Sequence, residues 1–436
     1  MARPDPARLV AFDVLRAVAE QDAYANLELS RLLRERRVSG RDAALATELV
    51  GGTLRLQGAY DAVIGQLVDQ RLDGPVLDAL RLGVHQLLSM RTPTHAAVDS
   101  TVELVKERVG RRPSGLVNAV LRKVAQRSLE EWLEGRPVAE RLSHPQWVVD
   151  ALAVALDRPR ELEALLAADN ERPAVTLVAR PGLSTRDELG GEPLAVSPYA
   201  VALTGGDPGD IPAVREGRAG VQDAGSQLVA IALARAELEG PDRRWLDLCA
   251  GPGGKAALLA ALAAQVDARV LANERQPHRA ALVLQAVRAA RSGLLGVVAG
   301  DGTRPPWPVA SFDRVLVDAP CSGLGALRRR PESRWRRRPE DVDELVPLQV
   351  GLLERALDSL RPGGVVVYAT CSPVVAETAG VVAEVVARRT DVTVEPALHL
   401  VPEVKDAESA HLAGAVQLWP HRHGTDAMFL ALLRRD

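Results

Sequence analysis

The sequence is poor in cysteine and has no long apolar runs, and each shortage excludes a class of protein. It has three cysteines in 436 residues and no Cys-x-x-Cys pair, which argues against a disulfide framework and against a zinc site. No apolar run approaches the ~18 residues of a membrane span. The first residues, Met1 to Pro6, lack the apolar segment of a signal peptide. These absences predict a cytoplasmic protein with no membrane anchor and no metal.

Aromatic residues are also scarce, at 3%, so alanine, leucine and valine must fill the core. The hydrophobic share of 47% and the charged share of 25% are ordinary for a globular protein, and the length suggests two or three domains. The net charge of −3 excludes a polycation, so any affinity for nucleic acid must come from local patches. Lysine occurs only at positions 106, 123, 255 and 405, so a lysine within a motif stands out.

Residues 1 to about 130 have the apolar periodicity of helices. The expected helices are 7–18, 42–56, 61–68, 75–89, 95–109 and 114–125. Basic residues gather at 31–41 and 106–112. Because acids are interspersed with them, a solvated helical face is the ordinary interpretation and a phosphate-binding patch is the alternative.

Three runs within this region resemble the NusB family, a small helical bundle that binds RNA and, in some members, proteins. They are Ala43 to Arg55, Leu80 to Leu88 and Val117 to Arg122. The resemblance implies an all-α N-terminal domain with an RNA or protein partner.

The rest of the chain alternates between strand-like and helix-like segments. Residues 141–235 predict linker helices and a small α/β subdomain, with strands at 174–179 and 198–203. From Arg243 onward the alternation predicts a mostly parallel sheet with helices on both faces. The strands are expected at 243–248, 268–272, 295–298, 314–317, 364–369 and 428–433.

A glycine-rich turn, Gly251-Pro-Gly-Gly254, joins the first of these strands to an apolar helix at 256–264. This arrangement presents backbone N–H groups and a helix N-terminus to a nucleotide-like ligand. The turn matches a dinucleotide fingerprint weakly, and it fails as a phosphate loop because Ala256 stands where Ser or Thr should follow the lysine. It fits a methyltransferase cofactor loop well, with Asp247 ending the strand.

Further candidate residues follow the next strands. Glu274 ends the second strand about 20 residues after the turn, where an acid commonly holds ribose hydroxyls. Asp301 follows the third strand, Asp318 and Cys321 the fourth, and Cys371 the fifth. Because parallel strands collect ligands at their carboxyl ends, we expect these side chains at one edge of the sheet.

Two cysteines at neighbouring strand ends indicate thiolate chemistry of the kind that pyrimidine C5 methylation needs. C5 of cytosine is too poor a nucleophile to take a methyl group directly. A thiolate that adds to C6 makes C5 enamine-like, and C5 then attacks a sulfonium methyl group. A base must next remove the C5 proton so that the cysteine is expelled. The thiolate needs an electropositive pocket, to which Lys255 can contribute.

Four motifs together resemble the Sun-type RNA cytosine-C5 methyltransferases, and they are Cys249 to Lys255, Asp318 to Gly325, Arg329 to Trp335 and Thr370-Cys-Ser372. With the NusB-like region, the chain is similar to the RsmB type, which modifies small-subunit (16S) ribosomal RNA. The resemblance implies S-adenosyl-L-methionine (S-adenosylmethionine) as cofactor, held by Cys249, Ala250, Gly251, Pro252, Gly253, Gly254, Lys255, Glu274, Asp301 and Asp318. It implies Cys371 as the nucleophile that attacks C6 and Cys321 as the residue that assists product release.

These observations predict a multidomain protein that acts as a monomer on ribosomal RNA. We expect a NusB-like helical RNA-binding domain at 1–140, linker helices with a small α/β subdomain at 141–235, and a Rossmann-like α/β methyltransferase domain at 236–436. A non-catalytic RNA-binding assembly factor is the alternative, which the intact cysteines oppose. An NAD-dependent oxidoreductase would leave both cysteines unexplained.

Three details refine this prediction. Gly251 replaces an alanine of many relatives and should be tolerated. His421 and His423 suggest a strand-entry turn rather than a metal site, because no third ligand is near in sequence. Trp335 lies within an arginine-rich stretch, residues 328–338. Because this stretch follows the Pro-Cys pair, we expect it at the rim of the active site in contact with RNA, with anchoring of the loop as the alternative for Trp335.

Overall fold

The computed structural model describes residues 5–90 and 92–436. They form two compact units. The helical unit comprises Met1–Asp150, Leu166–Glu171 and Leu327–Arg337, and the sheet unit comprises Ala151–Leu165, Arg172–Ala326 and Arg338–Asp436. Met1 to Pro4, part of the stretch that predicted no signal peptide, lie outside the described residues. Within the described ranges, no helix has both the length and the apolar character needed to cross a membrane.

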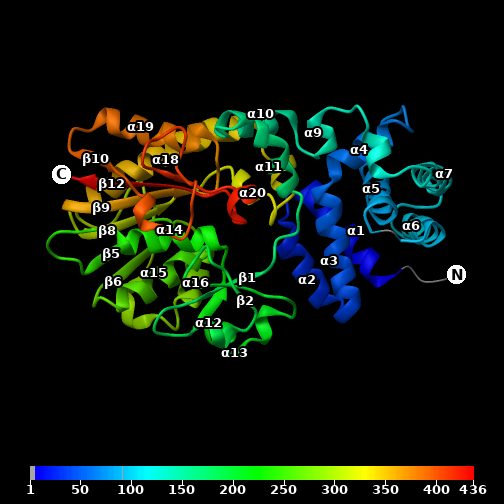
Figure 1. Ribbon diagram of the computed structural model, residues 1–436. Coiled ribbons are helices and arrows are strands. Elements are labelled where there is room, and N and C mark those ends of the chain that lie inside the picture. The colour runs from blue at the N-terminus through cyan, green and yellow to red at the C-terminus, as the bar shows by residue number, and fades with distance from the viewer. Residues whose placement is uncertain (1–4, 91) are drawn as a thin grey trace. The chain divides into compact units, whose positions relative to one another are not determined.

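The helical unit is an all-α bundle (Figure 1). Its helices are α1 (Pro6–Gln21), α2 (Ala25–Glu35), α3 (Gly40–Arg55), α4 (Gln57–Gly65), α5 (Gly74–Leu88), α6 (Thr94–Arg108), α7 (Ser114–Val124), α8 (Leu129–Leu133), α9 (Val138–Arg141) and α17 (Ser333–Arg336). The α1 helix packs on α2, α3 and α5 through a stripe that includes Val10, Val14 and Leu15. All six expected helices are present. Periodicity missed α2, because its buried face is short and lies within the basic stretch.

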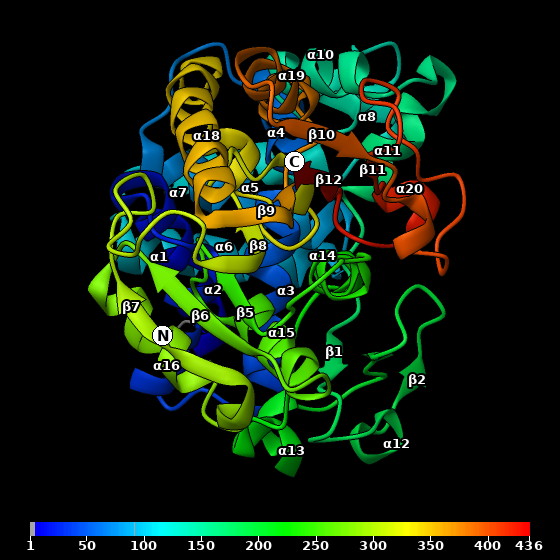
Figure 2. The same cartoon turned by 90° about the vertical axis from the view of Figure 1, so that its left-hand side faces the viewer.

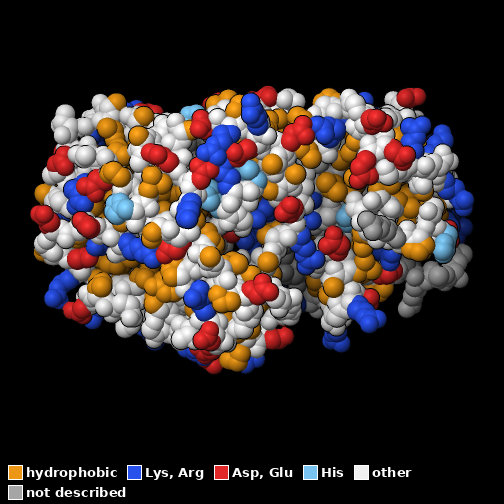
Figure 3. Space-filling view, viewed as in Figure 1, with side chains coloured by type: hydrophobic (Ala, Val, Ile, Leu, Met, Phe, Trp, Pro, Cys, Tyr) orange, Lys and Arg blue, Asp and Glu red, His pale blue; other side chains and the backbone are white. Residues whose placement is uncertain are grey.

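Several residues of the basic stretches pair with acids within the same unit. Arg31 pairs with Glu28 and Glu35 on its own helix. Arg36 and Arg108 both pair with Asp13. These pairs favour the solvated helical face over a dedicated phosphate-binding patch. Figure 3 shows the same interspersion of basic and acidic side chains on the face in view.

The sheet unit contains two sheets. The smaller sheet is antiparallel, in the order β2-β3-β1-β4, and forms the expected small α/β part. Its strands are β1 (Thr176–Ala179), β2 (Glu192–Pro193), β3 (Ala200–Ala202) and β4 (Ala219–Val221), with helices α12 (Arg186–Leu189) and α13 (Pro212–Glu216). Two helices, α10 (Gln146–Ala155) and α11 (Leu162–Ala168), precede it in the chain.

The larger sheet has the order β10-β12-β9-β8-β5-β6-β7, with β11 paired to β12. Its strands are β5 (Arg244–Asp247), β6 (Arg269–Glu274), β7 (Leu294–Ala299), β8 (Phe312–Asp318), β9 (Leu360–Thr370), β10 (Val392–Glu395), β11 (Val416–Gln417) and β12 (Phe429–Arg435). The strands β5 to β9 are parallel, whereas β12 pairs antiparallel with β9 and with β10. The predicted Rossmann-like fold is confirmed. The edge strands β10 and β11 were not predicted, since both are short.

Helices cover both faces of this sheet (Figures 1 and 2). They are α14 (Ala224–Arg235), α15 (Gly254–Ala264), α16 (Pro277–Ala286), α18 (Pro339–Ser359) and α19 (Ala379–Arg388), and a short helix, α20 (Pro420–His423), precedes β12. Because side chains alternate along a strand, Trp245 packs in the core with α14 and α15, whereas Leu246 packs in the core with α18 and α19. Both faces are therefore apolar, which explains the nearly continuous apolar runs in these strands.

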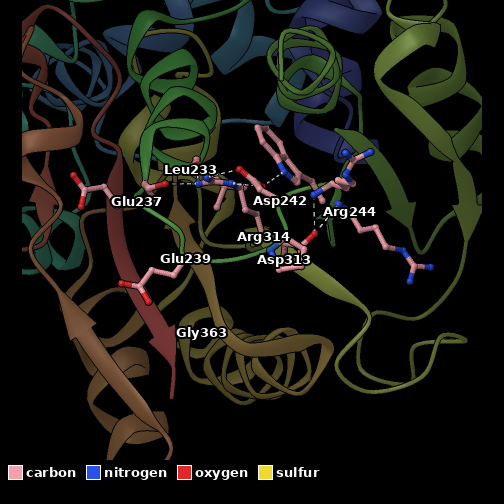
Figure 4. Close-up of polar contacts among 12 residues, drawn as sticks. Leu233, Glu237, Glu239, Asp242, Arg244, Asp313, Arg314 and Gly363 are labelled. Atoms are coloured by element: carbon pink, nitrogen blue, oxygen red, sulfur yellow. Dashed lines mark hydrogen bonds and ion pairs between the residues drawn. The ribbon is translucent and has the colours of Figure 1, made fainter. Parts of the chain in front are cut away.

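The amino ends of β5 and β8 are held by a partly buried ion pair and by hydrogen bonds to the backbone (Figure 4). The Arg314 guanidinium donates to both Asp242 carboxylate oxygens, at 2.9 and 2.7 Å, and to the Leu233 carbonyl at the end of α14. Asp313 accepts from the backbone N–H groups of Arg243 and Arg244.

The carboxyl ends of the strands form the opposite edge of the sheet. There the chain order reverses between β5 and β8, which is where open α/β sheets bind ligands.

Candidate active site

The glycine turn links β5 to α15 and is shaped by two close approaches. Gly253 has φ +111°, in the left-handed region, and a Cβ there would lie 2.6 Å from the Ala286 Cβ. A Cβ on Gly251 would lie 1.9 Å from a carboxylate oxygen of Glu274. The missing side chains let the turn lie directly against β6 and α16, and they leave backbone N–H groups at the start of α15 for a ligand. A glycine at position 251 therefore fits this turn, whereas an alanine there would require Glu274 to move.

Asp247, at the end of β5, is fully buried, and neither carboxylate oxygen has a hydrogen-bond partner among the described residues. Burial and, to a lesser extent, the nearby Asp318 charge raise the pKa of Asp247 to about 8. The Lys255 charge and the nearby Cys249 backbone N–H, which does not reach hydrogen-bond geometry, oppose this shift. A buried acceptor without a donor is costly, so this carboxylate is prepared for a ligand that brings a donor or a positive charge.

Lys255 lies in the first turn of α15 and donates from Nζ to the Asp318 carboxylate at 2.8 Å. Burial lowers the pKa of Lys255, but the attraction of Asp318, Cys371 and Asp247 outweighs burial and raises it. The lysine is therefore a firmly held positive charge whose field reaches the Cys371 thiol. This contact joins the cofactor turn to the loop after β8.

The carboxyl ends of β6 and β7 carry the two other predicted acids. Glu274 is buried, accepts from the Gln276 backbone N–H at 2.9 Å and faces the glycine turn. Asp301 is partly exposed and accepts two hydrogen bonds from Thr303, which lower its pKa. The Asn273 side chain, near the end of β6, donates to the Leu248 carbonyl after β5 and to the Gly300 carbonyl after β7. These bonds hold the ends of the three strands together.

The two candidate catalytic cysteines meet. The Cys321 and Cys371 sulfur atoms are 3.4 Å apart, at the ends of the neighbouring strands β8 and β9. The hydrogen bond to Cys371 and then burial raise the pKa of Cys321 well above its usual value. Either thiol can be the donor in this contact, and the raised pKa of Cys321 favours a protonated Cys321. The third thiol, Cys249, lies after β5, and burial raises its pKa, so its side chain is an inert packing group.

Beneath the two cysteines lies a polar group that sequence reasoning missed. The buried Glu377 carboxylate accepts hydrogen bonds from Ser322, Ser372 and Gln349. The two serines directly follow the cysteines in sequence, and this was the only available signal. Nothing in the spacing of Glu377 indicated that it would fold back beneath both loops.

The arginine-rich stretch requires a correction. Arg334 is completely buried in the helical unit, and its guanidinium donates to the Ser143 and Asp169 carbonyls and to the Asn170 side chain. Burial lowers its pKa to about 10. The Trp335 indole donates to the Leu54 carbonyl. Because Arg334 is buried, its predicted contact with RNA is wrong. The hydrogen bond of Trp335 supports the alternative prediction, that Trp335 anchors the loop.

The two histidines near the C-terminus take structural roles in α20. His421 pairs with Glu161 at 2.8 Å. His423 accepts from the Trp419 backbone N–H and contacts the Lys405 carbonyl. Across residues 5–90 and 92–436, no cluster of three or more His, Cys, Asp or Glu side chains could hold a metal ion.

The residues at this edge fit S-adenosylmethionine. Its ammonium group suits the unpartnered Asp247 carboxylate, its ribose hydroxyls suit Glu274, and the glycine turn leaves room for the ligand against the backbone. A mostly parallel sheet with this turn, this buried acid and these strand-end loops defines the class of S-adenosylmethionine-dependent methyltransferases.

Comparison with known proteins identifies the family within this class. Residues 232–434 match the model of the family 16S rRNA methyltransferase RsmB/F, and residues 5–126 match the NusB family. The protein Rv1407 of Mycobacterium tuberculosis, named as a methyltransferase, is 51% identical over 99% of this chain and 97% of its own length. The ribosomal RNA small subunit methyltransferase B of Enterobacter sp. (strain 638) is 32% identical over 94% of this chain and 98% of its own.

The crystal structure of PH0851 shares the fold, with a TM-score of 0.79 at 22% identity over 100% of this chain and 99% of that one. The chain thus belongs to the RsmB/F family of 16S rRNA methyltransferases and carries an N-terminal NusB domain. The predicted family and cofactor are confirmed.

Proposed function

We propose that this protein methylates C5 of a cytidine in small-subunit ribosomal RNA through a covalent bond between Cys371 and C6 of the base. The observation that carries the proposal is the pair of thiols 3.4 Å apart, beside a loop that fits S-adenosylmethionine. A methyltransferase that acts on a nucleophilic nitrogen or oxygen needs no thiol, whereas a poorly nucleophilic ring carbon needs one. Bound S-adenosylmethionine supplies an electrophilic methyl group on its sulfonium.

The electrostatics give the two cysteines different roles. We assign the shared proton to Cys321, whose pKa is raised, so that Cys371, with its sulfur 3.4 Å away and within the field of Lys255, is the thiol that ionises. The Lys255 ammonium group attracts the negative charge that develops on the Cys371 sulfur. Cys371 then attacks C6, and the electron pair displaced onto C5 forms the new bond to the methyl group.

Cys321 acts in the second half of the reaction. Once the Cys371 sulfur is bound to C6, it is a neutral thioether and no longer accepts a hydrogen bond as a thiolate. The largest cause of the raised pKa of Cys321 is then removed. Cys321 then releases its own proton to water and, as a thiolate, accepts the C5 proton, after which the C5–C6 double bond re-forms and the Cys371 sulfur departs as a thiolate. The order of the two ionisations follows from the contact between the sulfurs.

The substrate must bring one base to the strand ends, so the target cytidine is unpaired or flipped out of its helix. A substrate in ribosomal RNA places the proposed activity in the cytoplasm. The RNA-binding role of residues 1–140 and the predicted domain boundaries remain predictions.

The test uses Cys371→Ala in the full-length protein. We expect methylation of small-subunit RNA from a strain lacking the enzyme to fall by more than about 100-fold, because nucleophilic catalysis is removed. Bisulfite sequencing measures 5-methylcytosine, and calorimetric titration with S-adenosylmethionine should give the wild-type affinity. Undiminished methylation by the variant contradicts the nucleophile role. A wild-type protein that binds the RNA without methylating it supports an assembly factor instead.

A further inference from the structure

We propose that Glu377 is a positioning residue that holds the two cysteine-bearing loops at the separation that the reaction needs. The inference rests on the proposed function for its consequence in catalysis. The positioning itself depends only on the contacts of Glu377, and it can be tested without RNA.

Glu377 is completely buried and lies at the end of η5 (Val375–Glu377), a short 3-10 helix after β9. Its carboxylate accepts from the Ser322 backbone N–H at 2.7 Å and from the Ser322 hydroxyl at 2.5 Å. It also accepts from the Ser372 hydroxyl at 2.6 Å. The two hydroxyls are 3.0 Å from each other. One carboxylate thus binds the residue after each candidate catalytic cysteine.

A helix on the same face of the sheet completes the arrangement. The Gln349 side chain, from α18, donates to the Glu377 carboxylate at 3.1 Å and to the Pro320 carbonyl at 2.9 Å. The Tyr368 hydroxyl, from β9, donates to the Glu377 carbonyl at 2.8 Å. Glu377 is therefore fixed from α18 and from β9, and the residues on both sides of Cys321 are fixed in turn.

The strand ladder alone does not hold the cysteines. The last backbone bond between the strand ends runs from the Ala319 N–H to the Ala369 carbonyl, before either cysteine. Beyond it, the Gly325 N–H donates to the Cys371 carbonyl at 2.9 Å. Further ties between the two loops pass through Ser322, Ser372 and Glu377. Because each serine is adjacent to a cysteine, movement of the serines would change the separation of the sulfurs directly.

A neutral amide holds the two loops less firmly than this carboxylate does. One oxygen of Glu377 accepts from the Ser322 N–H and the Gln349 amide, and the other accepts from the Ser322 and Ser372 hydroxyls. In Glu377→Gln, an NH₂ group replaces one of these oxygens, and the hydroxyls facing it must rotate to accept instead of donate. The two loops then lose the charge-assisted hydrogen bonds that hold them together, although the size of the side chain is preserved.

The experiment measures the separation of the thiols and the methylation rate in the same variants. Diamide removes two electrons and two protons from paired thiols and joins the sulfurs as a disulfide. Since the sulfurs start 3.4 Å apart, we expect rapid bond formation between Cys321 and Cys371 in the wild type, quantified by peptide mass spectrometry. In Glu377→Gln we expect this rate to fall by about 10-fold and the single-turnover methylation rate by about 10- to 100-fold, with S-adenosylmethionine affinity unchanged.

Glu384→Gln is the matched control, because Glu384 lies on α19 in the same segment, is partly exposed and pairs with Arg388. It should match the wild type in both rates. Ser372→Ala, which removes one hydroxyl donor and keeps the carboxylate, should fall between the wild type and Glu377→Gln. This second variant also keeps the inference testable if Glu377→Gln fails to fold.

Wild-type disulfide formation and methylation in Glu377→Gln would overturn the inference. A loss of both rates that merely follows the unfolded fraction, measured by circular dichroism, also overturns it, since that result shows a structural role alone. If the wild type makes no 5-methylcytosine but the disulfide rate still depends on Glu377, the positioning role stands and the proposed function fails.

Discussion

The two halves of the active-site edge satisfy their buried carboxylates in opposite ways. On the cofactor half, Asp247 is buried without a hydrogen-bond partner among the described residues, and its pKa is raised to about 8. On the cysteine half, Glu377 is equally buried but accepts hydrogen bonds on both oxygens from three side chains and one backbone N–H. Asp247 ends β5, and Glu377 follows β9 on the other side of β8 in the same sheet, yet only Glu377 has its hydrogen bonds satisfied.

The difference separates residues that await a ligand from residues that build the site. An unsatisfied buried group is a cost that a bound molecule can remove, so it indicates where a donor of the ligand belongs. A fully satisfied buried carboxylate has no remaining capacity for a ligand and instead fixes the groups that donate to it. Substitutions on the cofactor half should therefore weaken cofactor binding, whereas substitutions on the cysteine half should slow methylation.

The largest effect is expected from Cys321→Ala on the cysteine half. Because Cys321 is the proposed acceptor of the C5 proton, we expect the proposed bond between Cys371 and the RNA to persist in this variant and multiple-turnover methylation to fall by about 100-fold or more. A denaturant-resistant protein–RNA band on a gel, absent in Cys321→Ala combined with Cys371→Ala, measures the trapped adduct. Normal turnover without that band would contradict the release role.

A smaller effect, confined to cofactor binding, is expected from Asp247→Asn. Loss of a charge-assisted hydrogen bond to the cofactor ammonium should weaken S-adenosylmethionine binding by roughly 10- to 100-fold. Calorimetric titration measures the affinity. The matched control is Asp267→Asn, whose side chain is 86% exposed, and it should bind as the wild type does. Equal affinities for all three proteins would show that Asp247 does not face the ligand.

A pH dependence of stability, small over any one pH unit, also arises from Asp247. Its pKa is about 8 in the folded protein and lies near 3.8 when unfolded, so the folded state binds the additional proton between these values. The free energy of unfolding should therefore fall as pH rises from about 4 to 8, by roughly 1 kcal/mol per pH unit. Urea unfolding of the cofactor-free wild type and of Asp247→Asn, compared at each pH, isolates this contribution. A difference that stays constant with pH would contradict the raised pKa.

Much of the fold follows from local pattern. Apolar periodicity located the main helices of the helical unit, and alternation of strands with helices predicted the parallel sheet, because both patterns reflect burial on a regular backbone. Short edge strands such as β10, and the helix α2 with its narrow buried face, carry too few apolar residues to be recognised.

The candidate site was predictable where the sequence itself determines the geometry. Strand-end placement brought Cys321 beside Cys371 and Lys255 beside Asp318, since parallel strands end at one edge. It did not find Glu377, because a glutamate seven residues after its strand reaches the cysteines only by folding back. It also misjudged Arg334, since a charged side chain in an arginine run is usually solvated and only tertiary carbonyl partners allow its burial.

By itself, the sequence determined which chemistry this protein has: a glycine turn for a nucleotide-like cofactor, acids at strand ends and two thiols in separate loops. Each of these features depends on residue type and on position relative to a strand. Only the tertiary structure decided which groups are satisfied and which are left open, because hydrogen-bond partners come from segments distant in the chain. For that reason Asp247 and Glu377, two buried acids that look alike in sequence, take opposite roles.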